Sequence, residues 1–315
     1  MSTPETMVAK VDAYLDDRRH SGFALRIEGE QLHRFARFAD QSDHRGSLTL
    51  KLAIQWASAS RGQRPITAAR RIEILRGFAK YCRQFDPDTE IPPRRLFGRA
   101  HRRLTPHIFT EAEIQTLTAA AADQLHPPGG LRGASCATIF GLIAATGLRI
   151  SEATGLKRSD VDLQHAVLHI RHAKFGKSRW VPVHPTTVQA LQRYSKQRDR
   201  ATLTAGTDAF FVFDHGHPAL ARSVQYAFKL LRRRLQWHSR GGHPVPRIHD
   251  LRHSFVCHRL EQWYAQGLDI DRNILALSTY IGHAKVTDTY WYVTATPQLL
   301  AIAARRFERR PGGLP

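Results

Sequence analysis

A stretch rich in proline and arginine, residues 86–104, constrains the fold of this chain more than any other feature of the sequence. It contains Asp86-Pro87-Asp88 and Ile91-Pro92-Pro93, and the arginines that follow show no apolar period. Because proline fixes φ and removes a backbone donor, these residues are expected to form an extended linker. The 315 residues are enough for one domain on each side of it.

The first 85 residues are predicted to form a helical domain. Their apolar residues recur every three or four positions, which is the spacing of one helix face. The last of these helices is expected to open near Thr67. The apolar residues with this spacing are Val8, Val11, Tyr14, Leu15, Leu32, Phe35, Phe38, Ala39, Leu48, Leu52, Ile54, Trp56, Ile72, Leu75, Phe78 and Ala79.

Residues 105–296 are predicted to form a second domain that combines helices with a β-hairpin. Thr110 and Glu113 have the spacing of a helix capping box, and amphipathic helical patterns follow. Residues 167–171 and 179–183 alternate β-branched and polar side chains, which predicts two strands joined by a basic turn. The expected fold is therefore mainly α with a small β-hairpin or sheet.

The chain is strongly basic, with 47 Lys and Arg against 27 Asp and Glu and a formal net charge of +20. Such a charge attracts polyanions, and a phosphate backbone held by Lys and Arg explains it most simply. Excess arginine kept only for solubility would not explain so large an imbalance. The basic residues 86–104 would suit a segment that passes close to DNA, although a solvated surface loop would have the same composition.

The cysteines and the termini indicate where the protein works. Cys82, Cys136 and Cys257 are far apart and form no C-x-x-C pair, so neither a disulfide framework nor a cysteine zinc site is expected. The N-terminus lacks a basic region followed by an apolar run, and no stretch approaches the roughly 18 apolar residues of a membrane span. We therefore expect a cytoplasmic protein of bacterial type with no membrane partner.

Two basic residues could serve phosphate chemistry. Arg149 follows Gly147 at a predicted helix start, and its guanidinium could bind two phosphate oxygens, although a surface arginine would look the same. Lys174 lies at the predicted hairpin tip, where an ammonium could protonate a leaving alkoxide. Lys177 is an adjacent competitor, and the chemistry alone does not choose between the two lysines.

The segment His249-Asp250-Leu251-Arg252-His253 allows two interpretations. His249 and Arg252 share one face of a helix, so an imidazole and a guanidinium could reach the same group. The pair His249 and His253, four residues apart, alternatively suggests a zinc hydrolase. Against zinc, Asp250 stands where a metalloprotease has glutamate, and no third ligand lies nearby in the sequence.

An aromatic cluster near residue 290 contains two possible nucleophiles. Gly282 and His283 are followed by Tyr290, Trp291 and Tyr292. A tyrosine phenol has an ordinary pKa of about 10, so it needs a base or a cationic field to attack at neutral pH. The two tyrosines are about 200° apart on a helix and cannot both face one site.

Taken in order, these motifs resemble the catalytic domain of the tyrosine recombinases, the phage-integrase family, over about residues 105 to 300. The His-x-x-Arg box, the Gly-His step and the nine-residue interval to the tyrosine are jointly specific. The resemblance implies a two-domain architecture, with residues 1–85 as a helical core-binding domain that contacts DNA. The implied catalytic residues are Arg149, Lys174, His249, Arg252, His283 and Tyr292, with Glu152 as support.

The resemblance also chooses between the alternatives that chemistry leaves open. The family's hairpin lysine opens a short basic turn, which favours Lys174 over Lys177. Its interval from the Gly-His step ends on Tyr292 and not on Tyr290. We therefore expect Tyr290 and Trp291 to be buried supporting residues.

The implied activity is site-specific DNA recombination without a cofactor or metal. Tyr292 would attack a phosphodiester and stay on the 3′-phosphate while Lys174 protonates the departing 5′-hydroxyl. The implied partners are double-stranded recombination sites, accessory DNA-bending proteins and a homo- or hetero-tetramer that integrates, excises or transposes a mobile element. Residues 297–315 would form a C-terminal helix and basic tail, packed on their own domain or exchanged between subunits.

Three other functions remain open, the first of which is the zinc hydrolase built on His249 and His253. A type IB topoisomerase-like enzyme would use similar nicking and closing chemistry without strand exchange. A non-catalytic DNA-binding protein would keep the basic charge, but it would not explain the complete set of residues.

Overall fold

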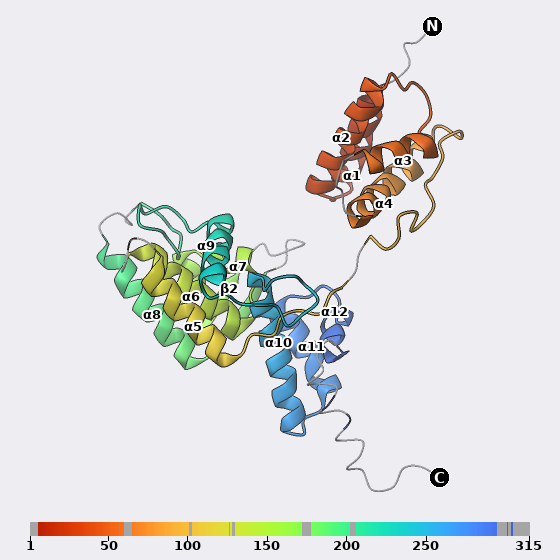
Figure 1. Ribbon diagram of the computed structural model, residues 1–315. Coiled ribbons are helices and arrows are strands. Elements are labelled where there is room, and N and C mark those ends of the chain that lie inside the picture. The colour runs from red at the N-terminus through yellow and green to blue at the C-terminus, as the bar shows by residue number, and fades with distance from the viewer. Residues whose placement is uncertain are drawn as a thin grey trace, which may run out of the picture. The chain divides into compact units, whose positions relative to one another are not determined.

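The computed structural model divides the chain into two compact units, Met1–Arg103 and Leu104–Pro315. The chain is mainly helical, with one small antiparallel sheet in the second unit, which confirms the predicted fold class (Figure 1). Among the described helices, none is long and apolar enough to cross a membrane. The structure describes residues 6–59, 65–100, 103–125, 127, 130–171, 178–201, 206–294, 301 and 304.

The first unit is built on the helices that the apolar periodicity predicts. Thr6 and Thr49 cap two of them, because each hydroxyl accepts a hydrogen bond from a backbone N–H of the first turn. Phe35 packs edge-on against both Trp56 and Phe78 in the buried centre. The helices are α1 (Met7–His20), α2 (Arg26–Gln41), α3 (Leu50–Ser58) and α4 (Pro65–Cys82).

The proline-rich residues that follow α4 form no helix or strand where they are described, and they pack against their own unit. The Glu90 backbone N–H donates to the carbonyl of Leu48 at 2.8 Å, and Arg70 Nε donates to the carbonyl of Ala100 at 3.2 Å. Thr89 is buried. These contacts satisfy polar backbone groups that proline prevents from joining a helix.

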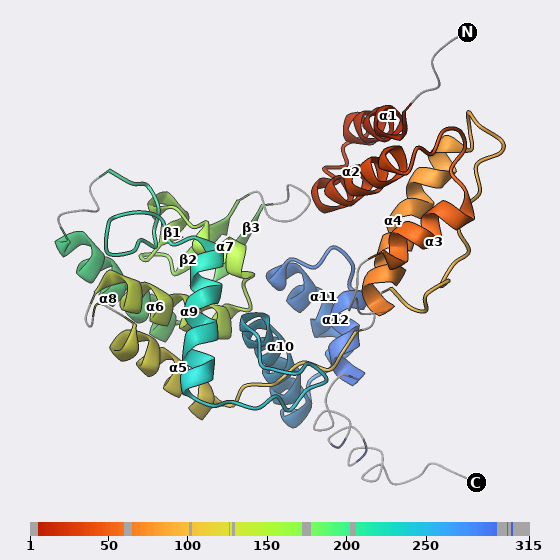
Figure 2. The ribbon, with the colours of Figure 1, turned by 45° about the horizontal axis from the view of Figure 1, so that its top comes forward.

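The second unit surrounds a long buried helix, α6, which packs against α5, α8 and α10 (Figure 2). The predicted capping box is present at the start of α5, where Thr110 and Glu113 exchange hydrogen bonds. The helices are α5 (Glu111–Gln124), α6 (Leu131–Thr146), α7 (Ile150–Thr154), α8 (Pro185–Arg200), α9 (Ala221–Arg234), α10 (Ile248–Ala265), α11 (Ile270–Ile281) and α12 (Thr287–Tyr290), with 3-10 turns η1 (Arg158–Asp160) and η4 (Trp291–Thr294).

The sheet has one strand more than the predicted hairpin. Strands β2 (Val167–Ile170) and β3 (Arg179–Pro182) pair antiparallel, with Leu168 opposite Val181. A two-residue strand, β1 (Val161–Asp162), pairs with the other edge of β2 and is too short to show an alternating pattern. The basic turn with Lys174 and Lys177 lies outside the described residues.

The core of the second unit depends on Phe140, and its loss should destabilise the unit. Phe140 is 0% exposed and packs edge-on against Phe228. We expect Phe140→Ala to lower the free energy of unfolding by about 3–5 kcal/mol, because it leaves a cavity. Urea denaturation followed by circular dichroism measures the change. Tyr226→Ala is the matched control, since Tyr226 is 55% exposed on α9, and equal losses in both variants would contradict this account of the core.

Candidate active site

A glycine turn between α6 and α7 places Arg149. Gly147 ends α6 with φ of +66°, a left-handed conformation that favours glycine. A Cβ atom there would lie 2.6 Å from a ring carbon of Phe255, so a side chain would also clash. Arg149 then stands at the N-cap of α7, with its side chain partly exposed.

Glu152 forms hydrogen bonds with Arg149 and fixes the orientation of its side chain. Arg149 Nη1 donates to Glu152 Oε1 at 2.7 Å, and the Arg149 backbone N–H donates to Oε2 at 3.0 Å. Arg149 Nη2 also donates to the carbonyl of Gly282 at 2.8 Å, which links the start of α7 to the end of α11. The buried carboxylate therefore holds the guanidinium in place, and its supporting role in catalysis stays a prediction.

Arg179 belongs to this cluster although it was not among the predicted site residues. Its Nη1 and Nη2 donate to the two oxygens of Glu152 at 3.1 and 2.9 Å, and its Nε donates to the carbonyl of Tyr280. Burial would raise the pKa of Glu152, but the hydrogen bonds from Arg179 and Arg149 lower it to about 2. The signal in the sequence was a charged residue on the same strand face as the buried Val181.

Arg252 brings a second guanidinium into the same region from α10. Its side chain is 1% exposed, and Nη1 donates to the carbonyl of Gly147 at 2.5 Å. Its Nη2 is buried and has no hydrogen-bond partner among the described residues. Burial and the nearby charge of Arg149 lower the pKa of Arg252 to about 10. A buried donor without a partner is costly, so this nitrogen favours a hydrogen-bond acceptor beside it.

His283 follows the left-handed Gly282, which ends α11 with φ of +71°. His283 Nδ1 lies 2.8 Å from Thr289 Oγ1, a contact that orients the ring. Burial, followed by the charges of Arg252 and Arg149, lowers the pKa of His283 to about 4. The imidazole is therefore neutral at pH 7, and the charges of both arginines act on it.

Tyr292 is buried inside this cluster, with only 3% of its surface exposed. Its hydroxyl lies 2.6 Å from His253 Nδ1, and its ring stacks on His283 with 6.3 Å between the ring centroids. His253 was considered only as a zinc ligand in the sequence, because nothing in its spacing shows a contact with a residue 39 positions away. Burial, then the nearby His249 and arginine charges, lower the pKa of His253 to about 2, so its imidazole is also neutral.

The expectation that Tyr290 is buried was wrong. Tyr290 is 39% exposed, and its hydroxyl donates to Asp271 Oδ1 at 2.8 Å. That hydrogen bond raises the pKa of Tyr290. Helix α12 ends at Tyr290 and a 3-10 turn continues from Trp291, which is half-buried, so the two tyrosines point to different sides.

The structure thus brings together most of the predicted site residues. His249 begins α10 as an exposed residue whose ring centroid is 4.7 Å from that of His253. Within the described parts of the chain, no group of three His, Cys, Asp or Glu is placed to hold a metal ion. The residues gathered here are Arg149, Glu152, His249, Arg252, His283 and Tyr292, whereas Lys174 lies outside the described residues.

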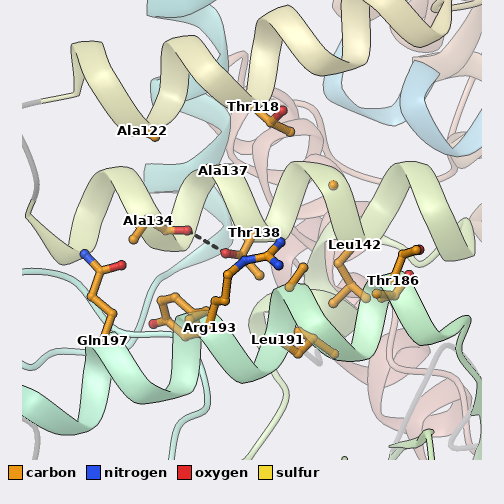
Figure 3. Close-up of a pocket in the computed structure, with 14 residues that line it drawn as sticks. Thr118, Ala122, Ala134, Ala137, Thr138, Leu142, Thr186, Leu191, Arg193 and Gln197 are labelled. Carbon is orange, nitrogen blue, oxygen red and sulfur yellow. Dashed lines mark hydrogen bonds between the residues drawn. The ribbon is translucent and has the colours of Figure 1, made fainter.

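A separate groove of about 490 Å³ runs along α6 and α8 and contains none of these residues. It is lined mainly by small side chains such as Ala134, Ala137 and Thr138, and Arg193 reaches across it from α8 toward Thr138 (Figure 3). The Thr138 hydroxyl donates to the carbonyl of Ala134, so it is already paired within its helix. The groove therefore lies apart from the cluster around Tyr292.

Comparison with known proteins identifies the family to which the chain is similar. The model of the phage integrase family matches residues 107–298. The Sinorhizobium fredii protein y4rB, which carries the name integrase/recombinase, is 37% identical over 95% of this chain and 96% of its own length. The tyrosine recombinase XerC of Chlamydia trachomatis serovar L2 is 30% identical over 74% of this chain and 68% of its own length.

A solved structure is similar in fold. A lambda integrase tetramer bound to a Holliday junction aligns with a TM-score of 0.64 and 16% identity over 92% of this chain and 78% of that chain. The sequence matches confirm the resemblance: the chain belongs to the phage integrase family. It is a tyrosine-type site-specific DNA recombinase.

The lowered pKa of Glu152 predicts a specific dependence of stability on pH. Because the folded pKa of about 2 lies below the ordinary value of 4.5, the unfolded chain binds this proton first as the pH falls. The stability that Glu152 contributes is therefore present above pH 4.5 and lost between pH 4.5 and about 2. We expect Glu152→Gln to lower the free energy of unfolding by on the order of 3 kcal/mol at pH 7. The variant should also lose less of its remaining stability than the parent protein as the pH falls from 4.5 to about 2.

Denaturant unfolding at a series of pH values measures this effect. Glu261→Gln is the control of opposite sign, because burial raises the pKa of Glu261 and its removal should steepen the decline. A Glu152→Gln variant whose stability falls as steeply as that of the parent protein would contradict the assigned ion pairs.

Proposed function

We propose that this recombinase cleaves and rejoins DNA through a covalent bond between Tyr292 and a 3′-phosphate. The observation that carries the proposal is the position of the Tyr292 hydroxyl, 2.6 Å from a neutral imidazole and within electrostatic reach of Arg252. A phenol so placed can lose its proton to a base while cations stabilise the charge that develops. Tyr290 has no such surroundings, since its hydroxyl donates to a carboxylate.

The scissile phosphate would bind between the two arginines and His283. Arg252 Nη2 supplies a buried donor, and Arg149 supplies a guanidinium held in place by Glu152. His283 engages Thr289 through Nδ1, which leaves Nε2 to donate to a phosphate oxygen. His249, exposed at the start of α10, would bind the same phosphate from its open side. Donors already in place for developing charge are usually the largest contribution to such catalysis.

The two proton transfers need separate groups. As the Tyr292 oxygen attacks phosphorus, the phenol proton passes to His253, whose Nδ1 lies 2.6 Å from the hydroxyl and accepts when the ring proton is on Nε2. The negative phosphate raises the basicity of this imidazole when DNA binds. The bond from phosphorus to the 5′-oxygen breaks, and Lys174 gives that oxygen a proton. A partner strand's 5′-hydroxyl later attacks the phosphotyrosine and reverses the step, so no cofactor is required.

The remaining assignments concern the rest of the chain and its partners. We assign residues 1–85 to DNA binding, residues 86–104 to a basic linker, residues 105–296 to catalysis, and residues 297–315 to a C-terminal helix and tail packed in cis or exchanged between subunits. The excess of positive charge supports contact with double-stranded DNA. The tetramer of lambda integrase on a Holliday junction supports assembly as a homo- or hetero-tetramer on DNA.

The cellular role follows from the substrate. Recombination sites carried by a mobile element are in the bacterial cytoplasm, and we place the protein there, with DNA-bending proteins as accessory partners. The matches to integrases and recombinases do not favour a type IB topoisomerase-like enzyme. The requirement for two DNA sites separates the two activities in an assay.

The assignment of the nucleophile is tested with a nicked suicide substrate made from the DNA that flanks the gene. Tyr292→Phe should abolish the covalent protein–DNA band, because the variant lacks the attacking oxygen. Tyr290→Phe is the matched control and should keep the band, since it loses only the hydrogen bond to Asp271. A band that persists in Tyr292→Phe would sink the assignment, and one lost only in Tyr290→Phe would move the nucleophile by two residues.

The assignment of the general acid is tested by changing the leaving group. Lys174→Ala should slow cleavage of a normal phosphodiester by about 100-fold to 10,000-fold, the usual contribution of a general acid. A substrate with sulfur in place of the bridging 5′-oxygen should be cleaved at close to the parental rate, because a thiolate leaves without a proton. Lys177→Ala is the control, and a rescue by sulfur in that variant alone would exchange the two lysines.

A further inference from the structure

Arg179 is not part of the motifs that carry the family resemblance, but its side chain contacts residues of the site. From β3 it donates to both oxygens of Glu152, at 3.1 and 2.9 Å, in a fork that fits a carboxylate. Its third donor, Nε, bonds the carbonyl of Tyr280 at 2.8 Å, in the last turn of α11. One largely buried guanidinium, with its side chain 11% exposed, therefore joins the start of α7 to the end of α11.

The backbone of Gly282 lies directly against the same guanidinium. A Cβ atom on Gly282 would stand 2.7 Å from Arg179 Nη1 and 2.8 Å from its Cζ. Arg149 binds this glycine from another direction, through its carbonyl oxygen. Arg179 thus packs on the turn that carries His283 and shares Glu152 with Arg149, so it contacts the supports of two phosphate-binding residues.

We propose that Arg179 is a positioning residue of the active site, which holds Arg149 through Glu152 and His283 through the Gly282 turn. The inference rests on the proposed function, in which Arg149 and His283 bind the scissile phosphate. Without the fork, Glu152 would keep only its bonds to Arg149 and could rotate with it. Arg179 itself has its three kinds of donor nitrogen occupied within the protein, so it has no donor to offer the substrate directly.

A purely structural role would also explain a buried ion pair, so the test must separate position from stability. A methylphosphonate replaces one non-bridging oxygen of the scissile phosphate with a methyl group and removes its negative charge. A variant with a misplaced Arg149 should be impaired less on this neutral substrate, because less charge needs stabilising. A variant that is only less stable has fewer active molecules and loses the same factor on both substrates.

The experiment compares single-turnover cleavage of suicide substrates that contain a phosphodiester or a methylphosphonate. We expect Arg179→Ala to slow cleavage of the phosphodiester by about 100-fold, the effect of a small misplacement of reacting groups, and to slow cleavage of the methylphosphonate by a clearly smaller factor. Arg179→Lys should fall between the parent and Arg179→Ala on the phosphodiester, because lysine keeps the charge without the fork. The Arg179→Lys variant can also replace Arg179→Ala in the test if Arg179→Ala does not fold.

Arg149→Ala in the same assay distinguishes a failure of the inference about Arg179 from a failure of the proposed role of Arg149. If Arg149→Ala is rescued by the neutral substrate and neither Arg179 variant is, the inference about Arg179 is overturned while the proposed function stands. If Arg149→Ala is not rescued either, the proposed role of Arg149 at the phosphate fails. Rescue of Arg149→Ala and of an Arg179 variant supports both.

A matched control exists in the same unit. Arg240 makes a similar fork to Glu113, which is the capping-box carboxylate of α5 as Glu152 is of α7. Arg240→Ala removes an ion pair of the same fork geometry, with a more exposed guanidinium, that no residue of the site shares. We expect this variant to cleave both substrates with equal loss or none, and a preference for the neutral substrate as large as that of Arg179→Ala would overturn the inference.

Discussion

The ion pairs of Glu152 are the interaction on which the active site depends. A buried carboxylate is costly unless charged donors surround it, and removing one of them leaves a charge without compensation. Glu152 meets this requirement with Arg149 from its own turn and Arg179 from the sheet. Because the two arginines also bind backbone carbonyls of α11, the carboxylate holds three separate segments of the chain at one point.

The site nevertheless retains an excess of positive charge. Arg149 and Arg179 share the single carboxylate of Glu152. Arg252 adds a third guanidinium, and one of its nitrogens is buried without a partner among the described residues. The histidines next to them are neutral because burial and the arginine charges lower their pKa values. Such an arrangement is complementary to an anion that the folded protein does not itself supply, which agrees with a phosphodiester substrate.

Much of the fold could be predicted because it depends on local patterns. Three of the predicted features reflect forces that act within a few residues. They are the helical period of residues such as Leu32 and Phe35, the capping box at Thr110, and the alternation in β2 and β3. Strand β1 escaped prediction because two residues carry no period. The burial of Tyr290 was wrongly predicted, because a partner on another helix, Asp271, holds its hydroxyl at the surface.

The sequence by itself determined which residue types stand at which intervals, and so the family and the candidates Arg149, His249, Arg252, His283 and Tyr292. Only the tertiary structure decided what each of them touches. The contacts of Tyr292 with His253 and of Arg179 with Glu152 join residues 39 and 27 positions apart. No local period or propensity encodes such contacts, because they exist only after folding has brought α10 against η4 and β3 against α7.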